Sequence, residues 1–191
     1  MLRELRVAFI LLLSLTMLTG VAYPLVVTGA AQLFFPRQAS GSLMERDGKP
    51  VGSDLLGQSF SGDKYFHGRP SAAGGVPYNG LGGAGSNLGP TNPALAEAVG
   101  KRVADIRQET GEPTKSIPID LVTSSASGLD PHISPAAALL QISRVAQSRK
   151  MSAQEVESLV RRHIEGPTWG LFGAPRVNVL RLNLALDKTP R

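Results

Sequence analysis

The sequence contains no cysteine, and only three of its 191 residues are histidines. Without cysteine the chain has no disulfide bond, no thiolate metal ligand and no lipoprotein acylation site. His67, His132 and His163 lie in unrelated segments, and none is paired with Asp or Glu at the spacing of known ligand sets. No metal site is therefore predicted.

Motifs for binding or transferring phosphate are also missing. The chain has no Gly-x-x-x-x-Gly-Lys-Ser/Thr run, and the glycine-rich stretch 80–85 has no preceding strand, following helix or lysine. An Asp-Lys-Thr-Gly phosphorylation sequence is absent, because Asp187-Lys188-Thr189 is followed by Pro190. The chain is not predicted to hydrolyse ATP by itself.

Basic residues are in excess but dispersed. The formal net charge is +5, and the longest basic cluster is Arg161-Arg162-His163. Scattered charge of this kind is typical of a solvated surface. No nucleic-acid partner is predicted.

One segment is long and apolar enough to cross a bilayer. Residues 7–35 carry no charge, and about 20 apolar residues suffice to span the hydrocarbon core. A cleaved signal peptide is the alternative, since Arg3 and Arg6 precede the run and small residues occur at 29–31. Signal-peptide apolar cores run only about 7 to 15 residues. We therefore predict an uncleaved anchor with its core at about 8–30.

Flanking charges indicate the orientation of this helix. Arg3 and Arg6 lie directly before it, whereas the basic residues after it are more widely spaced. The positive-inside bias favours a cytoplasmic N-terminus. In a bacterium the predicted organisation is a single-pass inner-membrane protein with a cytoplasmic end, a membrane helix and a soluble periplasmic domain, at residues 1–6, 7–35 and 36–191.

A polar strip runs through the apolar segment. Small or polar residues recur every four positions, with Thr19 and Tyr23 beside them: Thr16, Gly20, Pro24, Thr28 and Gln32. Such residues allow close helix packing and hydrogen bonds between membrane helices. The strip predicts a face for partner helices, although a chance distribution is the alternative. Pro24 removes a backbone hydrogen bond and predicts a kink.

The fold class is α/β, with one membrane helix followed by one mixed α+β soluble domain. Asp47-Gly48 predicts a hairpin turn between strands at 42–46 and 50–56. A long glycine-rich loop is expected at 71–92, and a strand at 117–122.

Three helices are marked by capping residues. One begins after Asn92 and ends near Thr110, one begins after Ser134 and ends near Arg149, and the third begins with the capping box of Ser152 and Glu155. Residues 177–186 alternate as a strand would, but Asn178 is also a candidate cap for a short helix. Both alternatives remain open from the sequence.

Ser127, Asp130 and His132 have the residue types of a hydrolase triad. No Gly-x-Ser-x-Gly elbow surrounds the serine. Asp130-Pro131 more simply starts a turn, and Ser134 caps the following helix. We expect a structural or interface loop, with an anchored hydrolase or ligand-binding module as the alternative.

Seven stretches together resemble the C subunit of the Kdp potassium-transporting ATPase. One of them reads Tyr65-Phe66-His67-Gly68-Arg69-Pro70-Ser71-Ala72. The resemblance covers almost the entire chain in the same order, and the stretches that carry it lie at 19–24, 35–43, 52–60, 65–72, 86–90, 120–134 and 177–187.

The resemblance implies a subunit of a high-affinity potassium uptake complex in a bacterial inner membrane. Its implied partners are a channel-like potassium-binding subunit, a P-type ATPase subunit and a small F subunit. The C subunit is implied to catalyse no reaction itself. It is implied to act as a catalytic chaperone, which raises the affinity of the ATPase subunit for ATP. Potassium is then the transported ion, and the chain has no cofactor of its own.

Direct contact with ATP conflicts with the predicted orientation, because ATP is cytoplasmic. The nearest candidate for a nucleotide-binding site is Gly57 and Gln58, since 55–58 faintly resembles the tail of a transporter signature motif; a strand end and turn is the alternative.

Polar loops at 71–92 and 123–134 are instead expected to cover the outer mouth of the channel-like subunit. Their candidate interface residues are Tyr78, Asn79, Ser86, Asn87, Ser127, Asp130 and His132.

Overall fold

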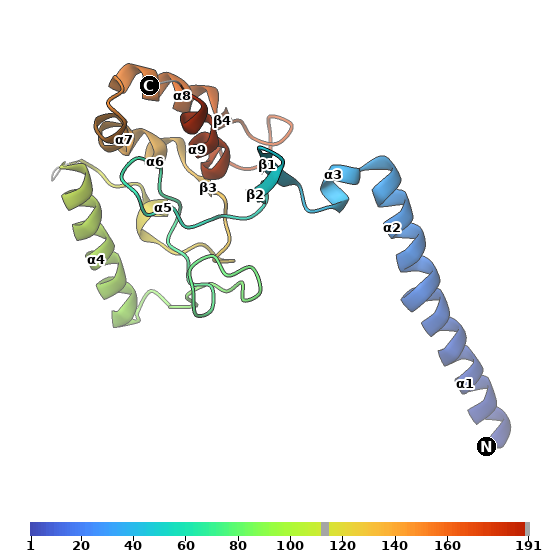
Figure 1. The fold of residues 1–191 in the computed structure, drawn as a ribbon. Helices are drawn as coiled ribbons and strands as arrows, with labels where there is room; N and C mark the ends of the chain where they lie inside the picture. Colours follow the sequence, from blue (N-terminus) through green and yellow to red (C-terminus); the bar gives the residue numbers. More distant parts are fainter. Residues whose placement is uncertain (112–114, 190–191) are drawn as a thin grey trace. The chain divides into compact units, whose positions relative to one another are not determined.

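The computed structural model describes residues 1–111 and 115–189, and the chain divides into two compact units, Met1–Val51 and Gly52–Arg191. In the first unit an apolar helix extends from Leu2 to Phe34 (Figure 1). It consists of α1 (Leu2–Met17), a π-helical turn η1 (Leu18–Ala22) and α2 (Tyr23–Phe34). Among the described residues it is the one helix long and apolar enough to span a membrane.

The π turn ends at Ala22, two residues before Pro24. Proline has no N–H to donate, so the α-helical pattern cannot continue unchanged through it. The N–H of Tyr23 bonds Leu18 O, and the Thr19 hydroxyl donates to Leu15 O at 2.7 Å. The helix therefore passes Pro24 with a local change of hydrogen bonding.

A short helix and a hairpin follow. They are α3 (Pro36–Ala39), β1 (Leu43–Arg46) and β2 (Lys49–Ser53). Asp47 and Gly48 have φ values of 53° and 71°, the left-handed pair that a two-residue hairpin turn requires. The predicted hairpin is confirmed, with its second strand ending at Ser53 rather than at residue 56.

The second unit contains a small antiparallel sheet with strand order β3-β5-β4. The strands are β3 (His132–Ile133), β4 (Ile164–Glu165) and β5 (Arg176–Asn178). Val177 of β5 pairs with Ile133 on one side and Ile164 on the other. The central strand is thus the last one in the sequence.

Short helices pack around this sheet and bury the core. They are α5 (Ile119–Val122), α6 (Pro135–Leu140), α7 (Ile142–Arg149), α8 (Ala153–Arg162) and α9 (Val179–Lys188). Fully buried residues come from the sheet, from four of these helices and from Phe66: Phe66, Ala137, Ala138, Val145, Val156, Val160, Val177, Leu182 and Leu186. The predicted mixed α+β class is confirmed.

The helix α4 (Pro93–Thr110) differs from the other helices described in the second unit because none of its residues is buried. Asn92 caps its start by accepting from Ala94 N, and Gly111 ends it at φ 66°. Its predicted bounds are confirmed. Between Ser53 and Pro93 the described chain has no helix or strand, as expected for the long loop at 71–92.

The expected strand at 117–122 is wrong. Residues 119–122 form α5, which follows Pro118 and buries Leu121 and Val122. Residue Pro118 has no N–H for a strand ladder and suits the start of a helix.

The helix expected after Ser134 is interrupted at Gln141, which separates α6 from α7. The Gln141 side chain is buried and binds both the N–H and the C=O of His67. The sequence around Gln141 did not indicate these hydrogen bonds, because His67 lies 74 residues away.

The C-terminal ambiguity is resolved in favour of the cap. Asn178 accepts from Arg181 N and begins α9, so the strand alternative for 177–186 is wrong beyond β5. Leu180 and Leu182, which alternate in sequence, are both buried although they lie about 200° apart around α9, so this helix is covered on more than one side.

Candidate functional site

The two predicted interface loops meet at Asp130, in a cluster that we call the Asp130 network. Its carboxylate accepts from Arg69 Nη1 at 3.0 Å and from His132 N at 2.9 Å. His132 Nδ1 lies 3.5 Å from the same carboxylate. Burial raises the pKa of Asp130, but hydrogen bonds from His132 and Arg69 outweigh it and hold that pKa below its usual value. The carboxylate is therefore charged at neutral pH.

Tyr78 also binds Arg69, through its backbone. Its hydroxyl donates to Arg69 O at 2.5 Å, and its own N–H donates to Ser71 Oγ at 2.8 Å. Ser71 Oγ donates in turn to Gly128 O at 2.6 Å. Burial, and then the negative charge of Asp130, raise the pKa of Tyr78 to about 12. The phenol stays protonated and acts as a donor.

Two glycines allow these loops to approach closely. A Cβ on Gly57 would lie 2.5 Å from Tyr78 Cε1 and 2.6 Å from Asp130 O. Gly128 has φ +68°, and a Cβ there would lie 2.5 Å from Ala84 O. The network therefore depends on backbone packing as well as on polar side chains.

The remaining predicted loop residues are more peripheral. Asn79 closes a local turn through Gly74 O and Leu81 N. Ser86 and Asn87 are exposed, and Asn87 adopts a left-handed φ of 51°. These side chains are available at the surface, whereas Tyr78 and Asp130 are half-buried.

The hydrolase triad is not assembled. Ser127 Oγ accepts from Leu129 N at 3.1 Å, and in the described part of the chain no hydrogen bond joins it to His132. His132 instead faces Asp130 within the network. No described group of three acidic, histidine or cysteine residues could hold a metal ion.

The nucleotide candidates lie at the edge of the same network. The N–H of Gly57 donates to Leu129 O at 2.8 Å, so this donor is already engaged. A Cβ on Gly52 would collide with the Gln58 side chain. Nucleotide binding by Gly57 and Gln58 stays a prediction, while their present contacts are explained by loop packing.

A second polar cluster was missed from the sequence. A cavity of about 210 Å³ lies between α4, α5 and the loop at 67–70. Beside it Arg144 donates to Gln141 Oε1 at 2.8 Å, and His67 Nδ1 lies 3.5 Å from Glu109. Burial, followed by the charge of Arg144, lowers the pKa of His67, so its ring is neutral at pH 7. No local motif marks these residues, because their partners come from distant segments.

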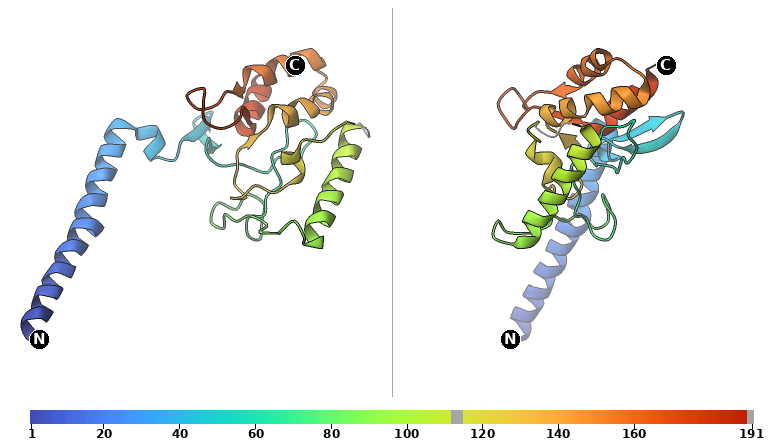
Figure 2. Two further views of the ribbon diagram at one scale, coloured as in Figure 1. Left: turned by 180° about the vertical axis from the view of Figure 1, so that it is seen from behind. Right: turned by 90° about the vertical axis from the view of Figure 1, so that its left-hand side faces the viewer.

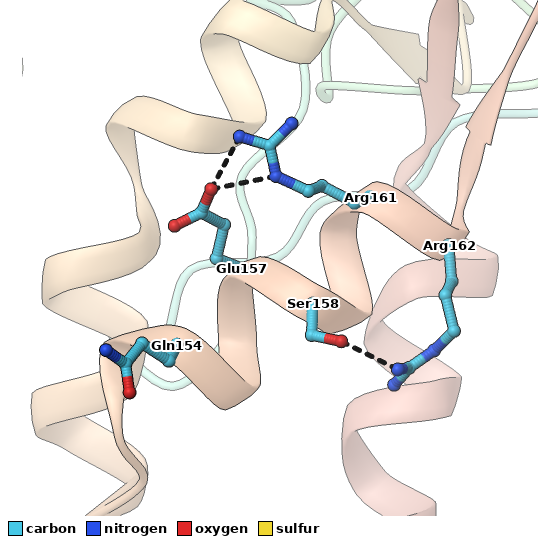
Figure 3. A pocket seen from close by; sticks show the side chains of 5 residues that line it. All are labelled: Gln154, Glu157, Ser158, Arg161 and Arg162. Carbon is cyan, nitrogen blue, oxygen red and sulfur yellow. Dashed lines mark hydrogen bonds and ion pairs between the residues drawn. The ribbon is translucent and has the colours of Figure 1, made fainter.

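A surface hollow of about 420 Å³ lies along α8 (Figure 3). Its side chains satisfy one another at i,i+4 spacing: Arg161 donates to Glu157 at 2.6 and 2.8 Å, and Arg162 donates to Ser158 at 2.8 Å. Such pairs are ordinary features of an exposed helix face. We assign no site to this hollow.

The polar strip of the membrane helix is exposed throughout. In an uninterrupted α-helix, a four-residue repeat from Thr16 to Gln32 would drift by about 160° around the axis. The π turn at Leu18–Ala22 accommodates one extra residue and so reverses about 100° of that drift. Thr16, Gly20, Pro24, Thr28 and Gln32 are thereby brought towards one face of the helix.

Comparison with known proteins gives a consistent result over almost the whole chain. Residues 5–188 match the family model described as "KdpC: K+-transporting ATPase, c chain". A potassium-transporting ATPase KdpC subunit from Sorangium cellulosum is 60% identical over 187 residues, covering 98% of each chain. The subunit of the same name from Polaromonas naphthalenivorans is 58% identical, over 96% of this chain and 93% of its own. That from Methylococcus capsulatus is 54% identical over 98% of each chain.

Proposed function

The chain belongs to the KdpC family, the c chain of the K+-transporting ATPase, and from this premise we propose that it is a non-catalytic accessory subunit that docks on its partners in the membrane. Its proposed partners are the channel-like potassium-binding subunit, the P-type ATPase subunit and the small F subunit. The observation that carries the docking proposal is the alignment of the polar strip by the π turn. A helix surrounded only by lipid has no need of such a face.

Substitutions on the strip test docking directly. A Cβ at Gly20 meets nothing closer than Thr16 Cγ2 at 4.0 Å, and one at Gly29 meets nothing within 4 Å. Leucine at either position therefore fits this helix, and only a partner helix would reject it. Gly20→Leu and Thr28→Leu should reduce co-purification of the other subunits several-fold, whereas Gly29→Leu, off the strip, should not. Equal recovery with all three variants would contradict the docking face.

The second unit is proposed to lie on the periplasmic side. Arg3 and Arg6 adjoin the cytoplasmic end of the helix, in keeping with the positive-inside bias. A reporter that is active only in the periplasm, fused after Arg191, should be active. Activity of a cytoplasm-specific reporter at the same position would instead reverse the orientation and reopen direct contact with ATP.

The loops of the Asp130 network are proposed to cover the outer mouth of the channel-like subunit. Because the chain contains no cysteine, a single introduced cysteine is the only thiol of this chain available for cross-linking. Ser86→Cys and Ser127→Cys are exposed positions on these loops and should cross-link to that subunit in the purified complex. Gln154→Cys on α8 serves as the exposed control. Cross-linking from residue 154 alone would place a different surface at the interface.

A raised affinity for ATP is proposed to arise by coupling between states, without contact between this chain and nucleotide. A docked subunit shifts an equilibrium only through its different affinities for the two states. The KM for ATP of the intact complex should increase when docking is weakened by Gly20→Leu, and remain unchanged with Gln58→Ala. A large effect of Gln58→Ala with docking intact would favour direct binding.

An anchored hydrolase is the less favoured alternative. It would require Ser127 to be activated by His132, but Ser127 Oγ is held by Leu129 N. Hydrolysis of ester substrates by the full chain, abolished by Ser127→Ala or His132→Ala, would support this alternative over an accessory subunit.

A further inference from the structure

The connection between β4 and β5 exposes three large apolar side chains close together. Trp169, Leu171 and Phe172 are 86%, 80% and 62% exposed. Residues 166–175, which we call the tryptophan loop, carry no charge, and Trp169 is the single tryptophan of the chain. Figure 2 shows this loop projecting from the rest of the second unit. Neither the Asp130 network nor the membrane helix accounts for it.

The tryptophan loop is a fixed turn. Thr168 and Phe172 exchange two backbone hydrogen bonds, at 2.8 and 3.0 Å, and Gly170 N donates to Pro167 O at 3.0 Å. The Trp169 and Phe172 rings pack edge to face with centroids 6.0 Å apart. Trp169 itself holds a left-handed φ of 54°. Hydrogen bonds within the loop thus fix an apolar tip in place, and insertion of the tip would order little further chain.

The base of the loop is charged, in contrast to its tip. Glu165 is bound by Arg176 at 3.4 Å and by Arg181 at 2.8 Å. An apolar tip with tryptophan above a base containing arginine suits the boundary between lipid headgroups and acyl chains.

The chain's own anchor keeps this loop close to a bilayer. Residues 35–51 connect the apolar helix to the second unit, and a segment of this length spans at most about 60 Å when fully extended. Tethering makes any contact between the second unit and the bilayer intramolecular, which raises its effective concentration. The surface that is always within reach of the tryptophan loop is therefore the membrane.

We propose that Trp169, Leu171 and Phe172 insert into the interfacial layer of the membrane that holds the helix Leu2–Phe34. The tip then forms a second, shallow attachment. It restrains the second unit against the bilayer surface without crossing it. This attachment requires the membrane anchor but neither the proposed subunit contacts nor a particular orientation.

Fluorescence of Trp169 tests the proposal without labelling. The full chain, without partner subunits, is placed in nanodiscs of ordinary phosphatidylcholine or of the same lipid brominated near the headgroup end of its acyl chains. Strong quenching by the brominated lipid, with blue-shifted emission, is expected. A Leu171→Ser, Phe172→Ser double variant keeps Trp169 as the fluorophore. The quenching of its emission by brominated lipid should be several-fold weaker than in the wild type. A Leu139→Ser variant, at an exposed leucine of α6, is the matched control and should quench as the wild type does.

Three results would overturn the proposal. Emission that is equally strong in both lipids would show that the tip is not in the membrane. A blue shift that appears only after addition of the purified partner subunits would assign the tip to a protein surface. A blue shift in lipid-free detergent that depends on chain concentration would assign it to a second copy of this chain.

Discussion

The loops of the Asp130 network and the tryptophan loop are both rich in glycine, but their side chains point in opposite directions. In the Asp130 network, polar side chains turn inward and join loops that are distant in sequence. In the tryptophan loop, backbone hydrogen bonds stay local and the large side chains point outward. Glycine serves close packing in the first case and turn geometry in the second. Replacing a glycine should therefore lower the free energy of unfolding by different amounts in the two loops.

The largest expected effect compares two glycines with positive φ. Gly128→Ala places a Cβ 2.5 Å from Ala84 O and 2.7 Å from Ala73 N, so the free energy of unfolding should fall by about 3 kcal/mol. Gly173, in the tryptophan loop, has φ +83° and nothing within 4 Å of a Cβ. Gly173→Ala should cost about 1 kcal/mol, the backbone strain alone. Urea unfolding of the full chain in detergent, followed by circular dichroism, measures both; equal losses would remove the distinction between the loops.

The ion pair of the network comes next. Arg69 and Asp130 have side chains only 25% and 29% exposed, so Arg69→Met should cost about 2 kcal/mol by leaving a half-buried carboxylate without its arginine partner. Arg161→Met breaks a pair in which the arginine is 62% exposed and should cost about 0.5 kcal/mol or less. The same unfolding assay applies. Similar losses for the two variants would mean that the network pair behaves as a surface pair.

Alkaline pH tests Tyr78. Tyr78→Phe removes one hydrogen bond and should cost about 1 kcal/mol at neutral pH. The folded pKa of Tyr78 is about 12, above the value of about 10 for an unfolded chain, so its contribution is fully present below pH 10 and is lost as the pH rises through 12. The difference in stability between wild type and Tyr78→Phe should therefore shrink between pH 10 and 12. A constant difference would contradict a buried, protonated phenol.

The smallest effect on folding is expected in the tryptophan loop. Leu171 is 80% exposed, so Leu171→Ser should change the free energy of unfolding in detergent by less than about 0.5 kcal/mol. A loss above 1.5 kcal/mol, about the scale of burying a side chain, would show that Leu171 packs within the fold.

Local signals explain what the sequence predicted well. Asn92, Ser134 and Ser152 each cap a helix through the nearest backbone N–H groups, as their spacing indicated. The turn at Asp47-Gly48 is equally local. Each of these interactions lies within a few residues, so it can be predicted before tertiary structure is known.

Long-range partners explain the rest. Arg69 and Asp130 lie 61 residues apart, and no spacing rule connects them. Gln141 interrupts a helix because it binds His67, 74 residues away. In the Ser127–His132 segment the sequence indicated the right turn and could not show that Asp130 faces Arg69 rather than a catalytic serine. The exposure of Trp169 could not be predicted from the sequence either, since glycine and proline indicate a loop but not whether its side chains are buried or exposed.

The order of the sheet has a consequence for biosynthesis. The strand β5 lies between β3 and β4, and α9 places Leu182 and Leu186 at the centre of the core. Synthesis proceeds from the N-terminus, so the apolar helix emerges from the ribosome first and can enter the membrane while residues 176–188 are still unmade. Until those residues arrive, β3 and β4 have no shared neighbour and the core lacks two of its fully buried leucines. Insertion of the anchor thus precedes folding of the second unit, and a chain released early would be membrane-bound, unfolded and open to proteolysis.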